Sequence, residues 1–321
     1  MLRRILAALI SLFLSLPAAA QSWPAKPVRV VLGYSTGGTA DNLGRMMTEK
    51  LSGALGQSVL IDNRPGASGN IAAQIVAKAA PDGYTVLFGC TAEMSINQHL
   101  MKDMGFNGEA DFAPVVLVHN VPLGLIVSAR SSYATLKDII DAARREPGKL
   151  SFANSGSGSP AHLAVEMLTL RSGVSMVQVP YKGAAPAMVD LLGGRIDAYF
   201  LGLPGVMPHV KSGAVRLLAV STAQRAGSLP DTPTVAEQAG IAGFNFSLWG
   251  GFLVPAGTPP EIVARLNREV LQVITQPDMR TRMAAEGSEV VRTSPQDFGR
   301  FVQDETKKYA DIARAANLQR Q

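Results

Sequence analysis

Three short segments rich in glycine and hydroxyl residues carry the groups that an anion-binding site needs. They are residues 34–39, 64–70 and 154–160. Glycine lets a backbone N–H approach a ligand closely, and the first turn of a following helix adds unpaired N–H groups with partial positive charge. Each hydrogen bond to a charged group contributes about 1.5–3 kcal/mol, so a few can hold a carboxylate without an arginine. We single out the hydroxyl donors Ser35, Thr39, Ser68, Ser155 and Ser159. Such residues also populate ordinary turns, so one segment alone would be weak evidence.

The third segment also matches part of a dinucleotide-binding fingerprint. Gly156, Gly158 and Ala161 fit the pattern G-x-G-x-x-A. That fingerprint expects an acidic residue about twenty positions on, where it binds a ribose. Residues 177–181 are Val-Gln-Val-Pro-Tyr and include no acid. The sequence therefore argues against a nicotinamide site, and we predict no cofactor.

Residues 66–70 resemble the nucleophile elbow of serine hydrolases. They are Gly-Ala-Ser-Gly-Asn and lack the final glycine of G-x-S-x-G. Because the surrounding strand, turn and helix would suit an elbow, a secreted hydrolase that uses Ser68 or Ser159 stays an alternative.

The four histidines do not lie in the spacing of a metal-binding motif, so we predict no metal site. We interpret His99, His119 and His209 as surface residues or as buried residues with satisfied hydrogen bonds. His162 differs because it falls in the first turn of a predicted helix behind the third segment. We include it among the candidate ligand contacts.

Parallel α/β units must position these segments. Continuous apolar runs predict strands, and 3.6-residue periodicity predicts helices between them. The first cluster has strands at 28–32, 58–61 and 84–88 and helices at 40–55 and 70–80. The second has strands at 150–153, 175–179, 196–201 and 215–220 and helices at 161–170 and 184–192. A helical tail follows at 260–275, 277–286 and 295–316. All three segments follow the carboxyl ends of strands, where open parallel sheets bind ligands.

The N-terminus has the parts of a secretory signal peptide. Arg3 and Arg4 precede an apolar run at 5–16, and Ala18, Ala19 and Ala20 supply a cleavage site. A membrane anchor is the alternative, but the run is shorter than the roughly 20 residues of a bilayer span.

Cleavage would leave 28 basic against 25 acidic residues, a mild excess without the clustered stripe of a nucleic-acid-binding surface. Cys90 is the single cysteine, which excludes an intramolecular disulfide and favours a small buried side chain.

Five motifs occur in order along the chain. They are residues 63–70 (NRPGASGN), 80–84 (APDGY), 179–183 (VPYKG), 230–237 (PDTPTVAE) and 255–259 (PAGTP). Together they closely resemble the Bug (Bordetella uptake gene) family, the substrate-binding components of tripartite tricarboxylate transporters. The likeness runs from about residue 23 to the C-terminus. Each motif alone is modest, but five in order are highly specific.

The resemblance implies an α/β fold like that of type II periplasmic binding proteins, with two Rossmann-like domains and a ligand cleft between them. In that family the chain crosses between the domains twice, and the C-terminal helices rejoin the first domain. We expect a signal peptide at 1–20, domain one at 22–123 plus 250–321, and domain two at 124–249. Ligands of similar proteins include di- and tricarboxylates, acidic amino acids, nicotinate-type compounds and terephthalate.

The resemblance also implies a set of ligand contacts. In such proteins two loops of the first domain often hold a carboxylate partly through ordered waters, which can be nearly as favourable as direct hydrogen bonds. The candidate ligand-binding residues are Tyr34, Ser35, Thr36, Gly38, Thr39, Ala67, Ser68, Gly69, Thr91, Ser155, Gly158, Ser159, His162, Tyr181, Gly183, Ala184, Ala185 and Leu201.

Two departures from the family pattern bear on the ligand. Ser35 and Thr36 stand where relatives often carry Pro-Pro or Ala-Pro, and Leu201 stands where many carry an acid. Without that acid an amino-acid ligand loses the partner of its ammonium group. Phe200, Leu201 and Trp249 would then favour a plain or aromatic carboxylate if they face the cleft; core packing is the alternative for Phe200 and Trp249. Lys182 either contacts the ligand or points into solvent.

We therefore predict a periplasmic solute-binding protein, not an enzyme, that captures a di- or tricarboxylate or an aromatic carboxylate. It would close on the ligand like a hinge and present the closed form to integral-membrane transporter subunits. A membrane sensor as the partner stays open. We expect a monomer that binds no nucleic acid.

Overall fold

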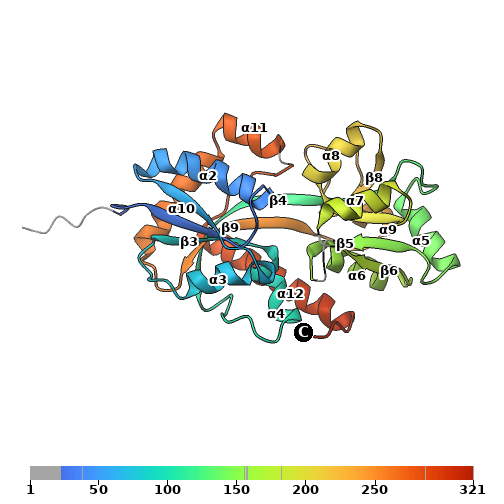
Figure 1. Cartoon of the computed structure of the whole chain (residues 1–321), viewed down its shortest axis with the longest axis horizontal. Coiled ribbons are helices and arrows are strands. Elements are labelled where there is room, and N and C mark those ends of the chain that lie inside the picture. The colour runs from blue at the N-terminus through green and yellow to red at the C-terminus, as the bar shows by residue number, and fades with distance from the viewer. Residues whose placement is uncertain are drawn as a thin grey trace, which may run out of the picture.

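The protein has two lobes joined by two long strands (Figure 1). The computed structural model describes residues 23–37, 39–154, 156, 158–181, 183–285 and 287–320. The predicted signal peptide lies outside these residues. Among the helices described, none combines the length and the apolar character that a bilayer span requires.

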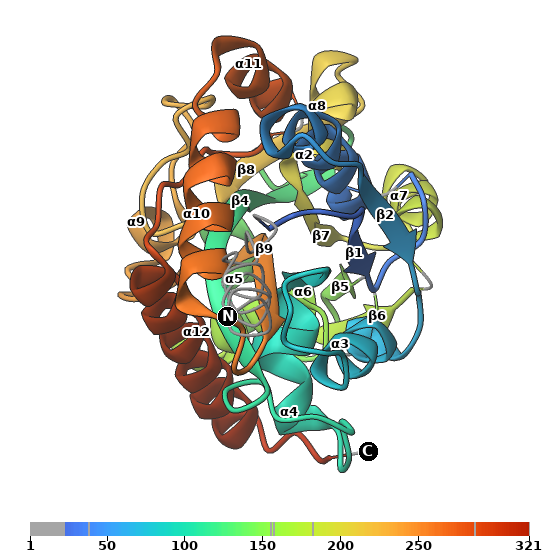
Figure 2. The same ribbon diagram turned by 90° about the vertical axis from the view of Figure 1, so that its left-hand side faces the viewer.

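The first domain is built from β–α units at the N-terminus and from helices of the C-terminal tail. Its N-terminal elements are β1 (Val28–Leu32), α2 (Thr39–Leu55), β2 (Val59–Asn63), α3 (Asn70–Ala77), β3 (Thr85–Cys90) and α4 (Asn97–Leu100). Its tail elements are α10 (Pro260–Ile274), α11 (Pro277–Ala285) and α12 (Pro295–Ala315). These helices cover both faces of the sheet, with α2, α10 and α11 on one face and α3 and α12 on the other (Figure 2).

The second domain repeats the same plan of strands alternating with helices. They are α5 (Leu136–Arg145), β5 (Ser151–Asn154), α6 (Pro160–Ser172), β6 (Val177–Pro180), α7 (Ala184–Leu192), β7 (Ala198–Gly202), α8 (Leu203–Lys211), β8 (Val215–Val220) and α9 (Val235–Ala239). Its core contains four packed phenylalanines; the closest pair, Phe244 and Phe246, has ring centroids 4.9 Å apart. Phe200 belongs to this core, so core packing is the correct alternative for that residue.

β4 (Phe112–Ser128) and β9 (Ser247–Pro255) carry the chain between the domains. The path through the sheets is β2-β1-β3-β9-β4-β7-β5-β6, and β8 also pairs with β4. The first half of β4 pairs with β9 as far as Pro122, and the second half pairs with β7 and β8 from Leu123 onward. The expected α/β fold with two crossings is confirmed. The sheets are mixed rather than wholly parallel, because β4 and β9 run antiparallel to their neighbours.

Two glycines allow β9 to lie where it does. A Cβ at Gly251 would overlap the Val116 carbonyl and the Phe298 ring, and a Cβ at Gly250 would overlap Nε2 of His119. A larger residue at either position would push β9 away from β4. These glycines therefore leave room beside β9 for the Val116 carbonyl, the Phe298 ring and the His119 ring.

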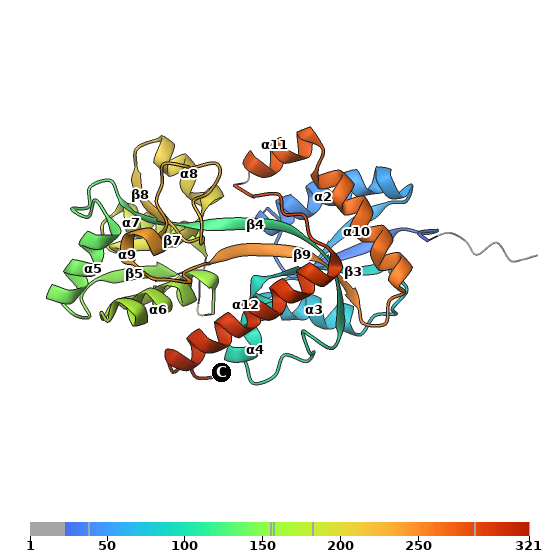
Figure 3. The ribbon, with the colours of Figure 1, turned by 180° about the vertical axis from the view of Figure 1, so that it is seen from behind.

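α12 packs against both domains (Figure 3). Near its start Phe298 enters the core of domain one, and near its end Tyr309 and Ile312 enter the core of domain two. Ser294 and Asp297 form a capping box that fixes its first turn. The C-terminal helices therefore do more than rejoin the first domain, because the last turns of α12 also support the second.

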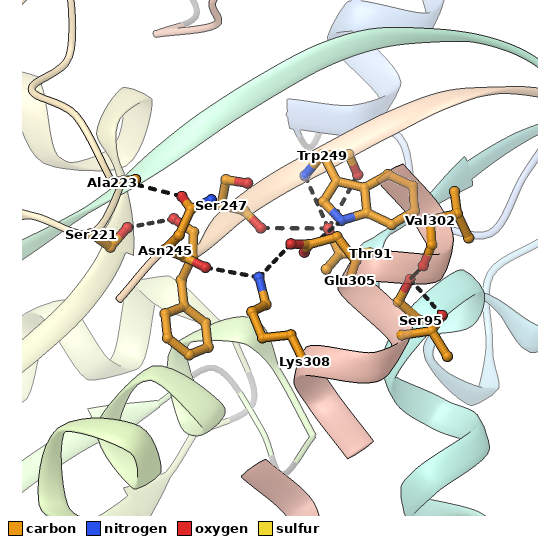
Figure 4. Close-up of polar contacts among 12 residues, drawn as sticks. Thr91, Ser95, Ser221, Ala223, Asn245, Ser247, Trp249, Val302, Glu305 and Lys308 are labelled. Atoms are coloured by element: carbon orange, nitrogen blue, oxygen red, sulfur yellow. Dashed lines mark hydrogen bonds and ion pairs between the residues drawn. The ribbon is translucent and has the colours of Figure 1, made fainter. Parts of the chain in front are cut away.

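A buried ion pair fixes α12 to the start of β9 (Figure 4). The indole N–H of Trp249 donates to Oε2 of Glu305 at 3.1 Å. Lys308 pairs with Glu305 and donates to the Asn245 carbonyl at 2.8 Å. Only 7% of the Glu305 side chain and 18% of the Lys308 side chain are exposed. Burial lowers the pKa of Lys308, and the neighbouring Glu305 carboxylate opposes that shift.

We predict that breaking this pair destabilises the protein more than removing both of its charges. Glu305→Gln leaves the Lys308 ammonium buried without a counter-charge, and Lys308→Met leaves the carboxylate in the same position. Each should lower the free energy of unfolding by about 3–5 kcal/mol. The double variant should recover most of this loss, because glutamine still offers an oxygen to Trp249. Chemical denaturation of the three variants measures these differences.

The control is Lys307→Met on the same helix, whose partner Asp311 and whose own side chain are exposed. It should change the free energy of unfolding by less than about 1 kcal/mol. Single variants no worse than this control would contradict the prediction.

Candidate functional site

A cavity of about 330 Å³ opens between the two domains. Its walls come from the loops after β1, β2, β3 and β5 and from the two crossing strands. The lining residues are Tyr34, Thr39, Ala40, Ser68, Cys90, Thr91, Ala92, His119, Gly156, Gly158, Ser159, Pro160, Leu248 and Trp249. Its volume lies within the range of roughly 300–1,000 Å³ that small-molecule sites occupy.

A buried carboxylate holds the loop after β1. Asp41 in the first turn of α2 accepts hydrogen bonds from the Gly37 N–H at 2.9 Å and from Asn63 at 2.9 Å. Arg45 also donates to it at 2.9 Å. Burial opposes its ionisation, but these donors hold the pKa of Asp41 below its usual value. The loop is therefore fixed at the N-terminus of α2, next to Thr39 and Ala40.

The loop after β2 carries unusual backbone conformations. Ala67 and Ser68 have φ values of 47° and 51°, in the left-handed region that residues with a Cβ rarely occupy. The amide of Asn97 holds the turn by donating to the Ser68 carbonyl at 3.1 Å. Such strain persists only where the surroundings impose it, and it is often found at binding sites.

The loop after β5 is organised around the start of α6. The Ser159 hydroxyl caps the helix by accepting from the His162 N–H at 3.2 Å. The His162 ring accepts from the Gly158 N–H at 3.0 Å through Nδ1. These contacts place Gly158, Ser159 and Pro160 in the cavity wall at the N-terminus of a thirteen-residue helix. The Ser159 hydroxyl thus has a structural role that needs no catalysis.

Six of the candidate ligand contacts line this cavity: Tyr34, Thr39, Ser68, Thr91, Gly158 and Ser159. Gly38 and Ser155 lie outside the described residues, as does Lys182. The other described candidates do not line it: Ser35, Thr36, Ala67, Gly69, His162, Tyr181, Gly183, Ala184, Ala185 and Leu201.

The candidates outside the cavity have other surroundings. The Tyr181 hydroxyl donates to Asp190 at 2.7 Å, and Leu201 packs in an apolar cluster of domain two. His162 lines a separate cavity of about 540 Å³ behind Gly158, together with Leu318 and Gln319 near the C-terminus. As ligand contacts, all of these residues stay predictions.

Leu248 and His119 were not among the candidate contacts, and the sequence left open whether Trp249 faces the cleft or packs in the core; the two crossing strands bring all three to the cavity. Trp249 is fully buried and makes two backbone hydrogen bonds with the Thr91 hydroxyl (Figure 4). Cys90 is buried, as predicted, and it also belongs to the cavity wall.

Of the two interpretations of His119, a surface residue or a buried residue with a satisfied hydrogen bond, the second is correct. Only 2% of it is exposed, and its ring has a hydrogen bond with the backbone of Leu248. Burial lowers its pKa to about 4, against an opposing effect of the Leu248 backbone. The ring stacks on Phe88 with centroids 5.7 Å apart. A histidine within an apolar strand was the signal that could have indicated this position.

A buried glutamate lies directly behind the cavity wall. Glu93, in the π-helical turn Ala92–Ile96, accepts from the Tyr34 hydroxyl at 2.8 Å and from the Cys90 N–H at 2.7 Å. Burial raises the pKa of Glu93 to about 7, although these two donors oppose the shift. Burial and the adjacent Glu93 carboxylate also raise the pKa values of Tyr34 and Cys90. Near neutral pH this carboxyl group therefore changes its protonation state within the folded protein.

Known proteins resemble this chain over nearly its whole length. Residues 43–318 match the family model of the tripartite tricarboxylate transporter family receptor. Protein BugT of Bordetella pertussis is 34% identical over 93% of this chain and 91% of its own length. The structure of R. palustris Rpa4515 with adipate is 37% identical, with a TM-score of 0.83, and the match covers 93% of this chain and 100% of that one. MatC from Rhodopseudomonas palustris with bound malate is 31% identical, with a TM-score of 0.78, over 90% and 99% of the two chains.

We predict that Glu93 makes stability fall as the pH rises towards neutrality. Its pKa is about 7 in the folded protein against 4.5 as the ordinary value, so protonation favours folding. The contribution, roughly 3 kcal/mol, is fully present below about pH 4.5 and is lost as the pH rises through about 7. Glu93→Gln cannot titrate. The free energy of unfolding of the parent, relative to this variant, should therefore drop between pH 4.5 and 7.5 in denaturation curves.

The other carboxyl groups affect the pH dependence of the free energy of unfolding equally in the parent and in Glu93→Gln. The difference between the two proteins therefore isolates Glu93. Glu109→Gln, at an exposed position, serves as the control and should show no such difference. A parent-to-Glu93→Gln difference that stays constant over this pH range would contradict the prediction.

Proposed function

The chain belongs to the tripartite tricarboxylate transporter receptor family, a family of periplasmic solute-binding proteins, and from this premise we propose that it captures a small carboxylate for transport. The proposed ligand class is a di- or tricarboxylate or an aromatic carboxylate. The proposed site is the cavity between the domains.

The observation that carries the proposal is the meeting of two helix N-termini in one cavity. α2 supplies Thr39 and Ala40 from domain one, and α6 supplies Ser159 and Pro160 from domain two. Helix N-termini offer unpaired N–H groups and partial positive charge, and both favour an anion. A carboxylate between them would be held by both domains at once, so binding would favour the closed arrangement.

The comparisons support the carboxylate class. Rpa4515 was solved with adipate and MatC with malate, and both ligands carry two carboxyl groups. The glycine-rich loops suit such ligands because they bind through backbone N–H groups and water. The candidate contacts at the start of α7 would join the ligand from domain two if the cleft closes further.

Export and partners follow from the same proposal. The signal peptide predicted at 1–20 would deliver the protein to the periplasm. There the ligand-bound form would dock on the integral-membrane subunits of a transporter. A sensor that recognises the same closed form would use the same binding event, so pull-down with the membrane subunits separates these two roles.

A thermal-shift screen against carboxylates tests the proposal directly. The mature chain should be stabilised by at least one member of a panel of citrate, malate, adipate, nicotinate, terephthalate and acidic amino acids. Ligand at a hundred times its dissociation constant adds about 2.7 kcal/mol to the free energy of unfolding. A panel without any hit, repeated after unfolding and refolding to remove bound ligand, would count against the carboxylate class.

We predict that Ala40→Asp abolishes carboxylate binding and leaves the fold intact. An aspartate in the first turn of α2 is compatible with the helix dipole, but here it places a like charge in the cavity wall. Like charges in contact cost several kcal/mol, so affinity should fall at least about a hundredfold in titration calorimetry.

Ala40→Asn is the matched control, because it has nearly the same size without the charge. It should weaken binding far less than Ala40→Asp. Equal effects of the two variants would mean that bulk, and not charge, determines binding at this wall.

A further inference from the structure

One acidic side chain is buried beside the cavity, and no described lysine or arginine pairs with it. Glu93 is fully buried and is not itself part of the cavity wall. Residues of the wall surround its carboxyl group. The Tyr34 hydroxyl donates to Oε2 at 2.8 Å, the Cys90 N–H donates to Oε1 at 2.7 Å, and Thr91 and Ala92 precede it in the chain. The carboxyl group therefore lies directly behind the surface that a ligand would touch.

The loop after β2 closes over the same carboxyl group. A Cβ at Gly69 would lie 2.5 Å from Oε2 of Glu93, so the glycine leaves the space that the carboxyl group fills. The loops after β1 and β2 and the end of β3 thus enclose Glu93 on three sides. This enclosure keeps water from the carboxyl group, and the charged form of a group without water is costly.

The other titratable groups near Glu93 supply no free positive charge. Burial and the Glu93 carboxylate raise the pKa values of Tyr34 and Cys90, so both stay uncharged. Two helices, α4 and α12, also pack against the turn that carries Glu93. On α4, burial lowers the pKa of His99, which disfavours its charged form. On α12, the lysine of the buried ion pair already has a carboxylate as its partner.

A bound carboxylate would bring a second negative charge against Glu93. No described residue of the cavity wall is a lysine or an arginine that could neutralise it. Like charges repel strongly where water is excluded, and the weaker acid of the two then takes up a proton. Here Glu93 is the weaker acid, because its pKa is about 7 and ordinary carboxylic acids lie near 4.

We propose that the cavity takes up a proton together with its ligand, and that the Glu93 carboxylate accepts this proton from the solvent. In the free receptor Glu93 is partly ionised near neutral pH; in the complex it is protonated. The coupling is reciprocal, so the proton tightens ligand binding as much as the ligand tightens proton binding. This inference rests on the proposed function, because only an anionic ligand repels the Glu93 carboxylate.

Titration calorimetry of the parent protein measures the proton directly. Malate and adipate are the probes, because both carry two ionised carboxyl groups at pH 7.5. Each is titrated at pH 7.5 in HEPES and in Tris, two buffers that differ in their enthalpy of ionisation. About half a proton should be taken up for each ligand bound, so the enthalpies observed in the two buffers should differ in proportion. Equal enthalpies in both buffers overturn the proposal, whether or not any variant folds.

Glu93→Gln identifies the group that takes up the proton. The parent should bind the ligand about five- to eightfold more tightly at pH 6 than at pH 8. Glutamine resembles the protonated carboxyl group and cannot titrate. The variant should therefore match the parent within about twofold at pH 6 and bind about five- to eightfold more tightly than the parent at pH 8. If Glu93 only supported the structure, the variant would bind more weakly at both pH values.

Glu109→Gln, at an exposed position of the same domain, is the control and should keep the proton uptake of the parent. Protonation of the ligand itself affects all three proteins equally, so the ratios of their dissociation constants are free of it.

Three outcomes separate the inference from the function on which it rests. Carboxylate binding without proton uptake overturns the inference and leaves the function standing. Proton uptake that persists in Glu93→Gln overturns it as well, because another group then holds the proton. Failure of every carboxylate to bind the parent would remove the proposed function, and the inference with it.

Discussion

Hydrogen bonds between β4 and β9 join the two domains, because both strands begin in one domain and end in the other. The pairs run from Phe112 and Pro255 to Pro122 and Ser247. At Leu123, β4 exchanges this partner for β7 and β8. The loops after β1, β2 and β5 lie on either side of this crossing, so their separation depends on it. The crossing strands also supply part of the cavity wall themselves.

The cavity has two chemically different parts. One part has the N-termini of α2 and α6, which favour negative charge. The other part has His119, Trp249 and Leu248 from the crossing strands, with Glu93 behind them, and it offers no cation among the described residues. A ligand that fits both parts has its carboxyl groups at the helix N-termini and a less polar part against the crossing strands. This contrast arises because helix ends and central strands meet at one place in the fold.

The sequence allowed most of the regular β–α units to be predicted, and the crossing strands escaped prediction for physical reasons. β1, α2, α7 and the tail helices have clear periodicity and clear terminal residues, and their predicted and observed ranges agree closely. β4 contains Pro114 and Pro122, and β9 contains Gly250 and Gly251, all of which normally argue against a central strand. Here Pro114 lies at an irregularity in the pairing and Pro122 lies where β4 changes partners. The glycine-rich loops were visible as candidates, but His119 and Leu248 could not be placed without those strands.

α12 changes the mechanics of this arrangement. Two adjacent strands alone would form a ribbon, about which the domains could bend and also twist. The helix packs in the core of domain one through Phe298 and in the core of domain two through Tyr309. It runs beside β4 and β9 and is not part of their sheet (Figure 3). A third support of this kind resists torsion, so the softest remaining movement is a rotation that opens or narrows the cleft. The two lobes would then meet in nearly the same register each time they close.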